Sequence, residues 1–212
     1  MKTTYEVDQP KKIETTTFEN VQITTVPPVY CPREDSFLLA NAVQQLAIGN
    51  VLDMGTGSGL QAIVAAKKSE VIRVVAVDLN TTALEVAKKN AERNKVADKI
   101  EFIRSNLFEK VTGKFDVIIF NPPYLPVEKE EKRDDESMAW HGGAKGRDFL
   151  DPFLEGFTKF LKPNGKLLLL QSSLNGPVKT KRKLAELGFK VTICGEETFF
   201  FEKIFVYVAK LQ

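Results

Sequence analysis

Short apolar runs alternate with segments of helical spacing from residue 50 to the end of the chain. The runs that predict buried strands are Val51–Met54, Val71–Val77, Ile100–Ile103, Phe115–Phe120, Lys166–Gln171, Phe189–Ile193 and Phe200–Ala209. Helical patterns occupy residues 60–68, 80–94, 149–161 and 177–187. Strands that alternate with helices of about ten to fifteen residues predict an α/β fold with a doubly wound, mostly parallel, seven-stranded sheet. We expect four phenylalanines to pack in the core of that sheet: Phe199, Phe200, Phe201 and Phe205.

The N-terminal part of the chain has a different pattern. Residues 11–29 are rich in β-branched side chains that alternate weakly about residue 20, which predicts a small β-hairpin. A short extended piece follows, and helical spacing begins at Phe37, with Asp35 or Ser36 as the candidate N-cap. We therefore divide the chain into an N-terminal extension, residues 1–34, and a main α/β domain, residues 35–212.

Composition narrows the class of protein without naming it. A chain of 212 residues that is 43% hydrophobic can bury one sizeable core, and its net charge of +2 is too balanced to indicate a nucleic-acid partner. Cys31 and Cys194 lie far apart and His141 is the single histidine, so no metal site is predicted and both thiols are expected to be reduced. A polar N-terminus and the lack of a long apolar run predict a cytoplasmic protein with no membrane segment.

The first candidate for chemistry is the tetrapeptide Asn121-Pro122-Pro123-Tyr124, which directly follows the predicted strand Phe115–Phe120. The amide oxygen of Asn121 and the carbonyl of Pro122 could each accept one N–H of a planar NH2 group, so that its lone pair points at an electrophile. The prolines would hold both acceptors rigid, and the Tyr124 ring would offer a face for stacking. The pattern predicts methyl transfer to a planar nitrogen; a strand-end turn without chemistry is the alternative.

A second constellation predicts a nucleoside cofactor. Gly55, Gly57 and Gly59 follow a strand and open a helix, so backbone can approach a ligand at the helix N-terminus. The dinucleotide pattern would place its third glycine at position 60, and Asp53 would repel a pyrophosphate but attract an ammonium and a sulfonium.

Two further residues extend this constellation. Asp78, at the end of the next strand, can accept both ribose hydroxyls, and Asn106 is placed to accept from the adenine amino group. Together with the glycine loop and Asp53, these residues predict S-adenosylmethionine as the cofactor.

These motifs together resemble the class I methyltransferases, and more narrowly the HemK-like group that methylates the glutamine amide of translation release factors. The stretches 29–39 (VYCPREDSFLL) and 139–147 (AWHGGAKGR) are similar to the archaeal and eukaryotic branch of that group. The resemblance covers roughly residues 20–210.

The resemblance implies roles for individual residues. Those expected to bind the cofactor are Tyr30, Glu34, Asp35, Asp53, Gly55, Gly57, Asp78, Asn106 and Asn121. Asn121, Pro122 and Tyr124 would be catalytic. Substrate would be bound by Asn121, Pro122, Pro123, Tyr124, Trp140 and Arg147, the last two in a loop with Gly142 and Gly143. Asn106 departs from the aspartate usual in the family, although its oxygen can still accept a hydrogen bond.

The resemblance also implies partners. Relatives in this branch work with a small zinc-binding activator protein that extends an edge of the sheet, and residues 100–103 are the expected edge strand. The bacterial branch has a longer helical N-terminal domain that has no counterpart here, so docking of the release factor should differ.

Three alternative functions remain open on the residues alone. Residues 128–136 hold six acids and three bases, a local charge of −3 that would repel phosphates and favours a peptide over DNA or RNA. N6-methylation of adenine would use the same Asn121 chemistry. Lysine methylation would make poor use of two acceptors, and a cofactor-binding subunit without activity is the third alternative.

Overall fold

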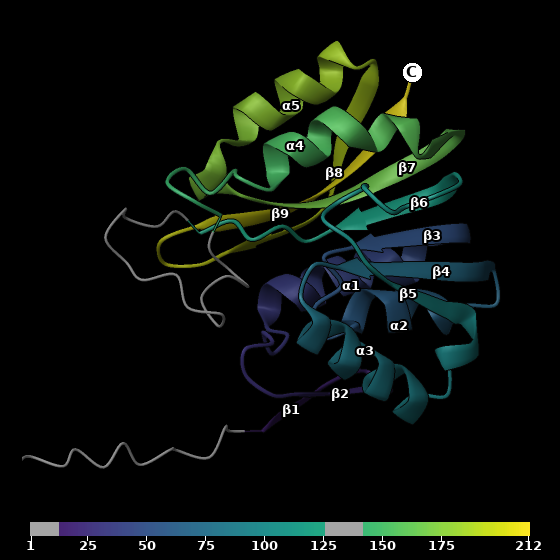
Figure 1. Cartoon of the computed structure of the whole chain (residues 1–212). Coiled ribbons are helices and arrows are strands. Elements are labelled where there is room, and N and C mark those ends of the chain that lie inside the picture. Colours follow the sequence, from purple (N-terminus) through teal and green to yellow (C-terminus); the bar gives the residue numbers. More distant parts are fainter. Residues whose placement is uncertain (1–12, 126–141) are drawn as a thin grey trace, which may run out of the picture.

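The computed structural model describes residues 13–125 and 142–212, which form two sheets and flanking helices (Figure 1). The strands are β1 (Glu14–Phe18), β2 (Val21–Thr25), β3 (Gly49–Met54), β4 (Val71–Asp78), β5 (Ile100–Arg104), β6 (Phe115–Phe120), β7 (Leu161–Ser172), β8 (Phe189–Thr198) and β9 (Lys203–Leu211). The α-helices are α1 (Glu34–Leu46), α2 (Leu60–Ala66), α3 (Thr81–Arg93), α4 (Leu150–Gly156) and α5 (Pro177–Glu186). Short 3-10 turns are η1 (Ala97–Lys99), η3 (Phe157–Lys159) and η4 (Ser173–Asn175).

The main sheet confirms the predicted doubly wound architecture. Its seven strands lie in the order β5-β4-β3-β6-β7-β9-β8. The five strands from β5 to β7 pair in parallel, and β9 pairs antiparallel with both β7 and β8. The strand order reverses between β3 and β6, which opens a crevice at the carboxyl ends of these two strands. β5 is an edge strand, as the sequence predicts.

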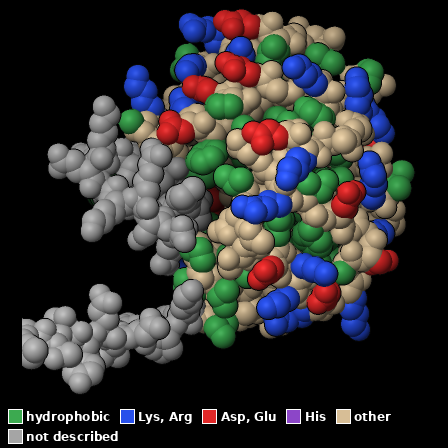
Figure 2. Space-filling view, in the orientation of Figure 1, with side chains coloured by type: hydrophobic (Ala, Val, Ile, Leu, Met, Phe, Trp, Pro, Cys, Tyr) green, Lys and Arg blue, Asp and Glu red, His purple; other side chains and the backbone are tan. Residues whose placement is uncertain are grey.

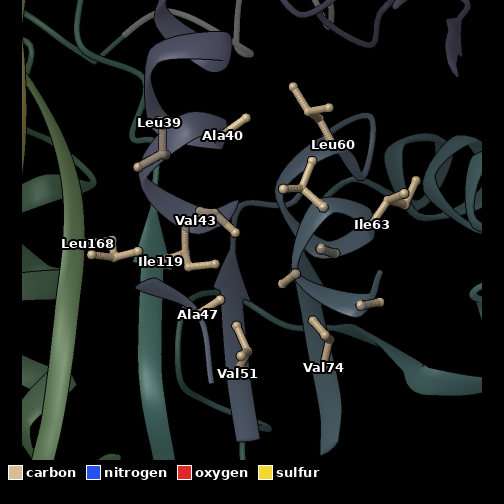
Figure 3. Close-up of a cluster of buried hydrophobic side chains, with 14 of the residues drawn as sticks. Leu39, Ala40, Val43, Ala47, Val51, Leu60, Ile63, Val74, Ile119 and Leu168 are labelled. Carbon is tan, nitrogen blue, oxygen red and sulfur yellow. The ribbon is translucent and has the colours of Figure 1, made fainter. Parts of the chain in front are cut away.

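Two apolar layers cover the sheet because successive strand residues face opposite sides. Helices α1, α2 and α3 lie on one face, and α4 and α5 lie on the other (Figure 1). Val51, Ile119 and Leu168 point to the first layer, where Figure 3 shows Ile119 next to Val43 of α1 and Val51 next to Ala47. The alternate residues Leu52, Ile118 and Leu167 pack with the second layer.

The predicted N-terminal hairpin is present as β1 and β2, which pair antiparallel from Phe18↔Val21 outward. Ile23 is fully buried in the core layer of α1 and α2. The buried side chain of Asn90 on α3 donates to the Thr24 carbonyl at 3.0 Å and the Ser58 carbonyl at 2.9 Å, and accepts from the Thr24 backbone N–H at 3.0 Å. The hairpin is therefore fastened to α3 beside the glycine loop.

The core prediction is wrong for two phenylalanines. Phe200 and Phe201 are 92% and 84% exposed, and they occupy the turn between β8 and β9, where the Phe199 N–H donates to the Glu202 carbonyl at 2.7 Å. The predicted last strand therefore begins three residues late, at Lys203. Phe199 and Phe205 do pack against the core.

Other differences concern element boundaries. The helix predicted to reach Leu161 ends at Gly156, and β7 begins at Leu161, five residues earlier than expected. The helix predicted to reach Lys68 ends at Ala66. Neither Asp35 nor Ser36 caps α1, because both lie buried inside its first turn while Arg33 is the N-cap.

Candidate active site

The register of the sheet brings the predicted site residues together. Met54 lies level with Val77 on β4 and with Phe120 on β6, so the residues that follow these strands emerge at one edge. A cavity of about 830 Å³ opens there. Its wall includes the predicted residues Tyr30, Asp35, Asp53, Gly55, Gly57, Asp78, Asn106, Asn121, Pro122, Pro123 and Tyr124.

Two predicted residues stand apart from that wall, and a third lies outside the described residues. Glu34 is exposed on the first turn of α1 and is absent from the described lining. Arg147 is buried elsewhere, as detailed below, and Trp140 lies outside the described residues.

The glycine loop runs from β3 to α2 in a left-handed backbone conformation. Gly57 has a φ of 54° and Gly59 a φ of 88°, a region that side-chain-bearing residues rarely adopt. A Cβ on Gly59 would lie 3.0 Å from the Cβ of Ala87, so α3 packs directly against the loop. The loop thus lies with its backbone close to the cavity, next to the N-terminus of α2.

Asp53 is the buried anchor of this loop. It is 1% exposed, and its Oδ2 accepts from the Thr56 hydroxyl at 2.6 Å and from the Ala62 backbone N–H at 3.1 Å. Burial raises the pKa of Asp53 to about 7, although both hydrogen bonds oppose the shift. The carboxyl therefore holds the loop and titrates near neutral pH.

Asp78 lines the cavity at the end of β4. Its Oδ2 accepts from the Gly57 N–H at 2.9 Å and its Oδ1 from the Asn80 N–H at 2.9 Å. Burial raises its pKa, against the effect of these N–H groups. Each carboxylate oxygen has a further lone pair, so Asp78 can still accept from a ligand's hydroxyl groups.

Asn106 follows β5 on the same rim. Its Nδ2 donates to the Glu109 carboxylate at 3.0 Å, which orients the amide and leaves its oxygen as the group suited to accept from an adenine amine. Binding of adenine by Asn106 stays a prediction.

Asn121 is oriented by a buried carboxylate from the N-terminal side. Its Nδ2 donates to Asp35 Oδ2 at 3.1 Å, and Asp35 Oδ1 accepts from the Tyr30 hydroxyl at 3.1 Å. The other end of the amide, Asn121 Oδ1, is buried with no hydrogen-bond partner among the described residues. An unsatisfied buried acceptor costs roughly 1–3 kcal/mol, and such exceptions call for a functional explanation. The arrangement leaves one oriented acceptor without a partner on a residue that lines the cavity.

The two tyrosines beside Asn121 are neutral at physiological pH. Burial, and then the Asp35 charge, raise the pKa of Tyr30 and of Tyr124 well above the ordinary phenol value. Neither hydroxyl can therefore act as a general base in this pH range.

The glycine-rich loop from Gly142 packs on the tetrapeptide. The Gly142 N–H donates to the Leu125 carbonyl at 3.0 Å. Gly146, with a φ of 64°, lies so close to the Tyr124 carbonyl that a Cβ there would overlap it. This segment therefore holds the back of the Asn121–Tyr124 loop in place.

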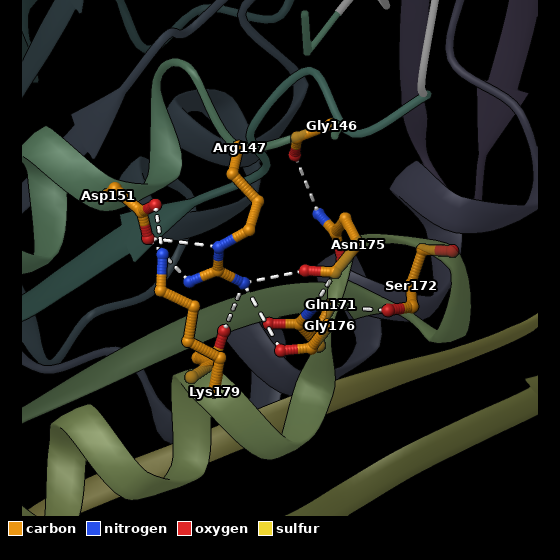
Figure 4. Close-up of polar contacts among 9 residues, drawn as sticks. Gly146, Arg147, Asp151, Gln171, Ser172, Asn175, Gly176 and Lys179 are labelled. Carbon is orange, nitrogen blue, oxygen red and sulfur yellow. Dashed lines mark hydrogen bonds and ion pairs between the residues drawn. The ribbon is translucent and has the colours of Figure 1, made fainter. Parts of the chain in front are cut away.

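Arg147 anchors that segment from within the protein (Figure 4). It is 7% exposed, and its guanidinium donates to Asp151 at 2.9 and 2.6 Å, to the Asn175 carbonyl at 2.6 Å and to the Thr180 hydroxyl at 2.9 Å. The Asn175 side chain donates in turn to the Gly146 carbonyl at 3.1 Å. We interpret Arg147 as a residue that positions the loop, where the sequence had predicted direct contact with substrate.

Several contributors were not predicted from the sequence. Thr56 lies inside the glycine motif and could have been found there as the partner of Asp53. Asn90 and Asn175 could be suspected only because each is a carboxamide among residues that are expected to be buried. Their hydrogen-bond partners are too distant in the sequence to be inferred from it.

The chain combines a seven-stranded sheet of this strand order with a glycine loop and the two acids Asp53 and Asp78 at the carboxyl edge of the sheet. These features define the class of doubly wound enzymes that bind a nucleoside cofactor. Within that class, the family described as Methyltransferase small domain matches residues 20–197. The chain belongs to this methyltransferase family.

Two relatives illustrate the range of similarity. A Methanocaldococcus jannaschii protein named "Putative protein N5-glutamine methyltransferase" is 44% identical over 189 residues, 89% of this chain and 94% of the relative. A "Release factor glutamine methyltransferase" of Agrobacterium fabrum is 37% identical over 114 residues, 51% of this chain and 39% of the relative. Both relatives confirm that the chain resembles the HemK-like glutamine methyltransferases, as its motifs indicated.

Solved structures share the fold. An E. cuniculi Mtq2–Trm112 complex, described as responsible for methylation of the eRF1 translation termination factor, has a TM-score of 0.67 at 25% identity, covering 87% of this chain and 99% of that chain. Methanocaldococcus jannaschii Trm5 in complex with adenosine has a TM-score of 0.71 at 17% identity, covering 96% and 56%, and supports the fold alone. Among the described residues, no helix is long and apolar enough to cross a membrane.

Proposed function

We propose that the protein transfers a methyl group from S-adenosylmethionine to the side-chain amide nitrogen of a glutamine in a translation release factor. The observation that carries the proposal is that Asn121 lines the cofactor-sized cavity, with its NH2 group held by Asp35 and its buried Oδ1 without a hydrogen-bond partner among the described residues. The names of the relatives, which specify glutamine and release factors, support the same substrate.

The residues present fit S-adenosylmethionine. A cavity of about 830 Å³ lies within the usual range for small-molecule sites. Asp78 offers acceptors for a ribose diol, and the ionised form of Asp53 would favour a cationic ligand. When bound, the cofactor supplies an electrophilic methyl group on a positively charged sulfur.

Asn121 would orient the acceptor nitrogen. A glutamine amide carries two N–H groups and a delocalised lone pair, so it is a poor nucleophile. Asn121 Oδ1 would accept one N–H and the Pro122 carbonyl the other, which turns the lone pair toward the methyl group and stabilises the positive charge that develops on nitrogen. Tyr124 would stack on the amide plane. The proton leaves to water, since the neighbouring phenols remain protonated.

Asp35 keeps Asn121 in the productive orientation. A carboxylate can only accept, so its contact with Asn121 requires the NH2 end of the amide to face Asp35. The oxygen end then points away from Asp35 and stays available as an acceptor. A rotated amide would lose this hydrogen bond and place two oxygens together.

The described surface favours a protein substrate over a nucleic acid. On the face shown in Figure 2, basic and acidic side chains of the described residues are interspersed rather than gathered into a basic stripe. With the acidic residues 128–136, this distribution gives phosphates little to bind.

The proposal includes a small activator protein at the free edge of β5. Within residues 13–125 and 142–212, β5 pairs only with β4, so its outer backbone groups can extend the sheet with a strand from a partner. The E. cuniculi neighbour was solved as a two-protein complex, which supports such an arrangement. The same proposal places the protein in the cytoplasm, where release factors act.

A transfer assay tests the function. Purified protein, alone and with a candidate activator, is incubated with methyl-labelled cofactor and with a release factor or an adenine-containing oligonucleotide. We expect a mass increase of one methyl group on one glutamine of the release factor. Transfer to adenine or lysine instead, or tight cofactor binding with no transfer to any release factor, would refute the proposal.

A further inference from the structure

The turn between β8 and β9 exposes two large apolar side chains. Phe200 and Phe201 form an edge-to-face pair with ring centroids 4.6 Å apart, and almost none of their surface is covered. We call this pair the aromatic tip. Single exposed apolar residues are ordinary, whereas two adjacent phenylalanines at the end of a hairpin bury no core and so call for another explanation.

The aromatic tip is held beside the active site. The Ser172 hydroxyl, at the end of β7, donates to Glu202 Oε2 at 2.7 Å, and the Lys203 N–H donates to the Ser173 hydroxyl at 2.9 Å. Figure 1 shows the turn on the side of the sheet toward which the β6 arrow points. The turn therefore projects from the same carboxyl edge as the Asn121–Tyr124 loop.

Short contacts connect the tip with Tyr124. Asn175, three residues after Ser172, donates to the Gly146 carbonyl, and Gly146 lies directly against the Tyr124 carbonyl. Phe199 and Tyr124 pack against the same core layer. The charge of Glu202 is also among the influences, after burial and Asp35, that raise the pKa of Tyr124. A polypeptide that delivers an amide to Asn121 would thus pass close to the tip.

The charge around the tip identifies the kind of partner. Glu196, Glu197 and Glu202 outnumber Lys203, and Lys203 is paired with Glu196 at 3.1 Å. An acidic surround disfavours anionic lipid headgroups and nucleic-acid phosphates. It is compatible with an apolar segment of a protein that is flanked by neutral or basic residues.

We propose that the aromatic tip is a docking element for the methyl-accepting protein, binding an apolar segment next to the acceptor residue. The inference rests on the proposed function and extends it by assigning substrate recognition to a hairpin outside the cofactor cavity. Exposed aromatic residues dominate many protein interfaces because they bury large areas at low entropic cost. The tip would therefore act on substrate affinity and not on the chemical step.

The test is steady-state kinetics with a purified release factor and the double variant Phe200→Ser/Phe201→Ser. We expect KM for the release factor to rise about tenfold or more, with kcat and cofactor affinity unchanged. Phe200→Leu/Phe201→Leu should recover most of the loss. The matched control is Ile72→Ser, which removes a 72% exposed apolar side chain near the amino end of β4 and should leave KM unchanged.

The outcomes separate this inference from the function itself. If the wild type transfers methyl groups and the double serine variant has an unchanged KM, the docking role is overturned and the proposed function stands. The same conclusion holds if the variant loses binding to phosphatidylserine vesicles or loses self-association while its KM is unchanged, because the tip would then bind a membrane or a second copy of the chain. A KM increase accompanied by weaker cofactor binding or a lower unfolding temperature marks a distorted turn and also overturns it. If the wild type transfers no methyl group to any release factor, the proposed function is refuted. The proposal that the aromatic tip binds a release factor is then refuted as well.

Discussion

The two sides of the active site are built by different kinds of contact. On the cofactor side, Asp53 binds Thr56 and Ala62, and Asp78 binds Asn80 and Gly57, so partners lie between 2 and 21 residues apart. On the acceptor side, Asn121 depends on Asp35, 86 residues away. The difference teaches that the proposed cofactor site is encoded by local motifs, whereas the proposed presentation of the acceptor depends on the tertiary fold.

This comparison predicts that damage on the two sides will affect different steps. Acceptor-side variants should impair transfer while they spare cofactor binding, and cofactor-side variants should do the reverse. Four changes test the division, in decreasing order of expected effect.

Asn121→Ala should lower the single-turnover rate of methyl transfer about a thousandfold, because it removes the fixed acceptor that orients the amide. Cofactor affinity, measured by calorimetry, should stay within about threefold, since Asn121 contributes only one group to a large cavity. Asn106→Ala is the control, which should bind the cofactor more weakly but keep its transfer rate when the cofactor is saturating. Equal loss of cofactor binding in Asn121→Ala and in Asp78→Ala would contradict the assignment.

Arg147→Ala should lower the free energy of unfolding by about 2–4 kcal/mol, because it leaves the buried Asn175 carbonyl and Thr180 hydroxyl without this donor. Among the described residues, Asp151 would keep only its ion pair with Lys179. The released loop should also raise KM for the protein substrate, with cofactor affinity retained. Chemical denaturation measures the first effect. Arg182→Ala, which breaks an exposed ion pair on α5, should cost no more than about 1 kcal/mol. A comparable loss in both variants would remove the case for an anchoring role.

Asp78→Ala should weaken cofactor binding by about ten- to a hundredfold, because it removes the acceptor for the ribose and the partner of the Gly57 N–H. At saturating cofactor, kcat should remain within about threefold of the wild type. The control is Asp98→Ala on the exposed turn η1. A variant that binds cofactor normally but transfers slowly would place Asp78 on the acceptor side.

Asp53 predicts a pH effect. Its pKa is raised from 3.8 to about 7 by burial, so the folded state holds a proton that the unfolded chain has already lost. Its contribution to the free energy of unfolding is therefore fully present below about pH 4 and disappears as the pH rises to about 7. Affinity for a cationic cofactor should change the other way, strengthening about three- to tenfold between about pH 6 and pH 8 as the carboxyl ionises.

Asp53→Asn is the matched variant for both pH dependences, that of the free energy of unfolding and that of cofactor affinity. Both hydrogen bonds go to one oxygen, which an amide can replace, so the loop should keep its structure. Thermal unfolding and calorimetry over this pH range should show flatter curves for the variant. Unchanged pH dependence of both quantities would exclude Asp53 as the titrating group.

The same division explains what could be predicted from the sequence. The glycine loop, Asp53, Asp78 and the Asn121 tetrapeptide follow strand ends, and the parallel register places all strand ends at one edge. Asp35 was expected near the cofactor, but its contact with Asn121 depends on how α1 packs over the sheet. Arg147 looks like an ordinary surface cation in the sequence, and only the approach of α5 and η4 gives its guanidinium buried partners.

Phe200 and Phe201 show the limit of apolar patterning. A run of phenylalanines at the start of a predicted strand resembles core, and the composition alone cannot distinguish a strand from a tight turn. The turn is set by the pairing of β8 with β9, in which Thr198 lies opposite Lys203 and leaves four residues to connect them.

The three hydrogen bonds of Asn90 have a practical consequence for anyone who handles this enzyme. They join the hairpin to the backbone at Ser58 on the cavity wall, so a truncation that removes β2, or a bulky fusion that displaces it, would loosen the proposed cofactor site. Poor cofactor retention in such a shortened or tagged preparation should first be traced to the detached hairpin, before any fault is sought in the catalytic residues.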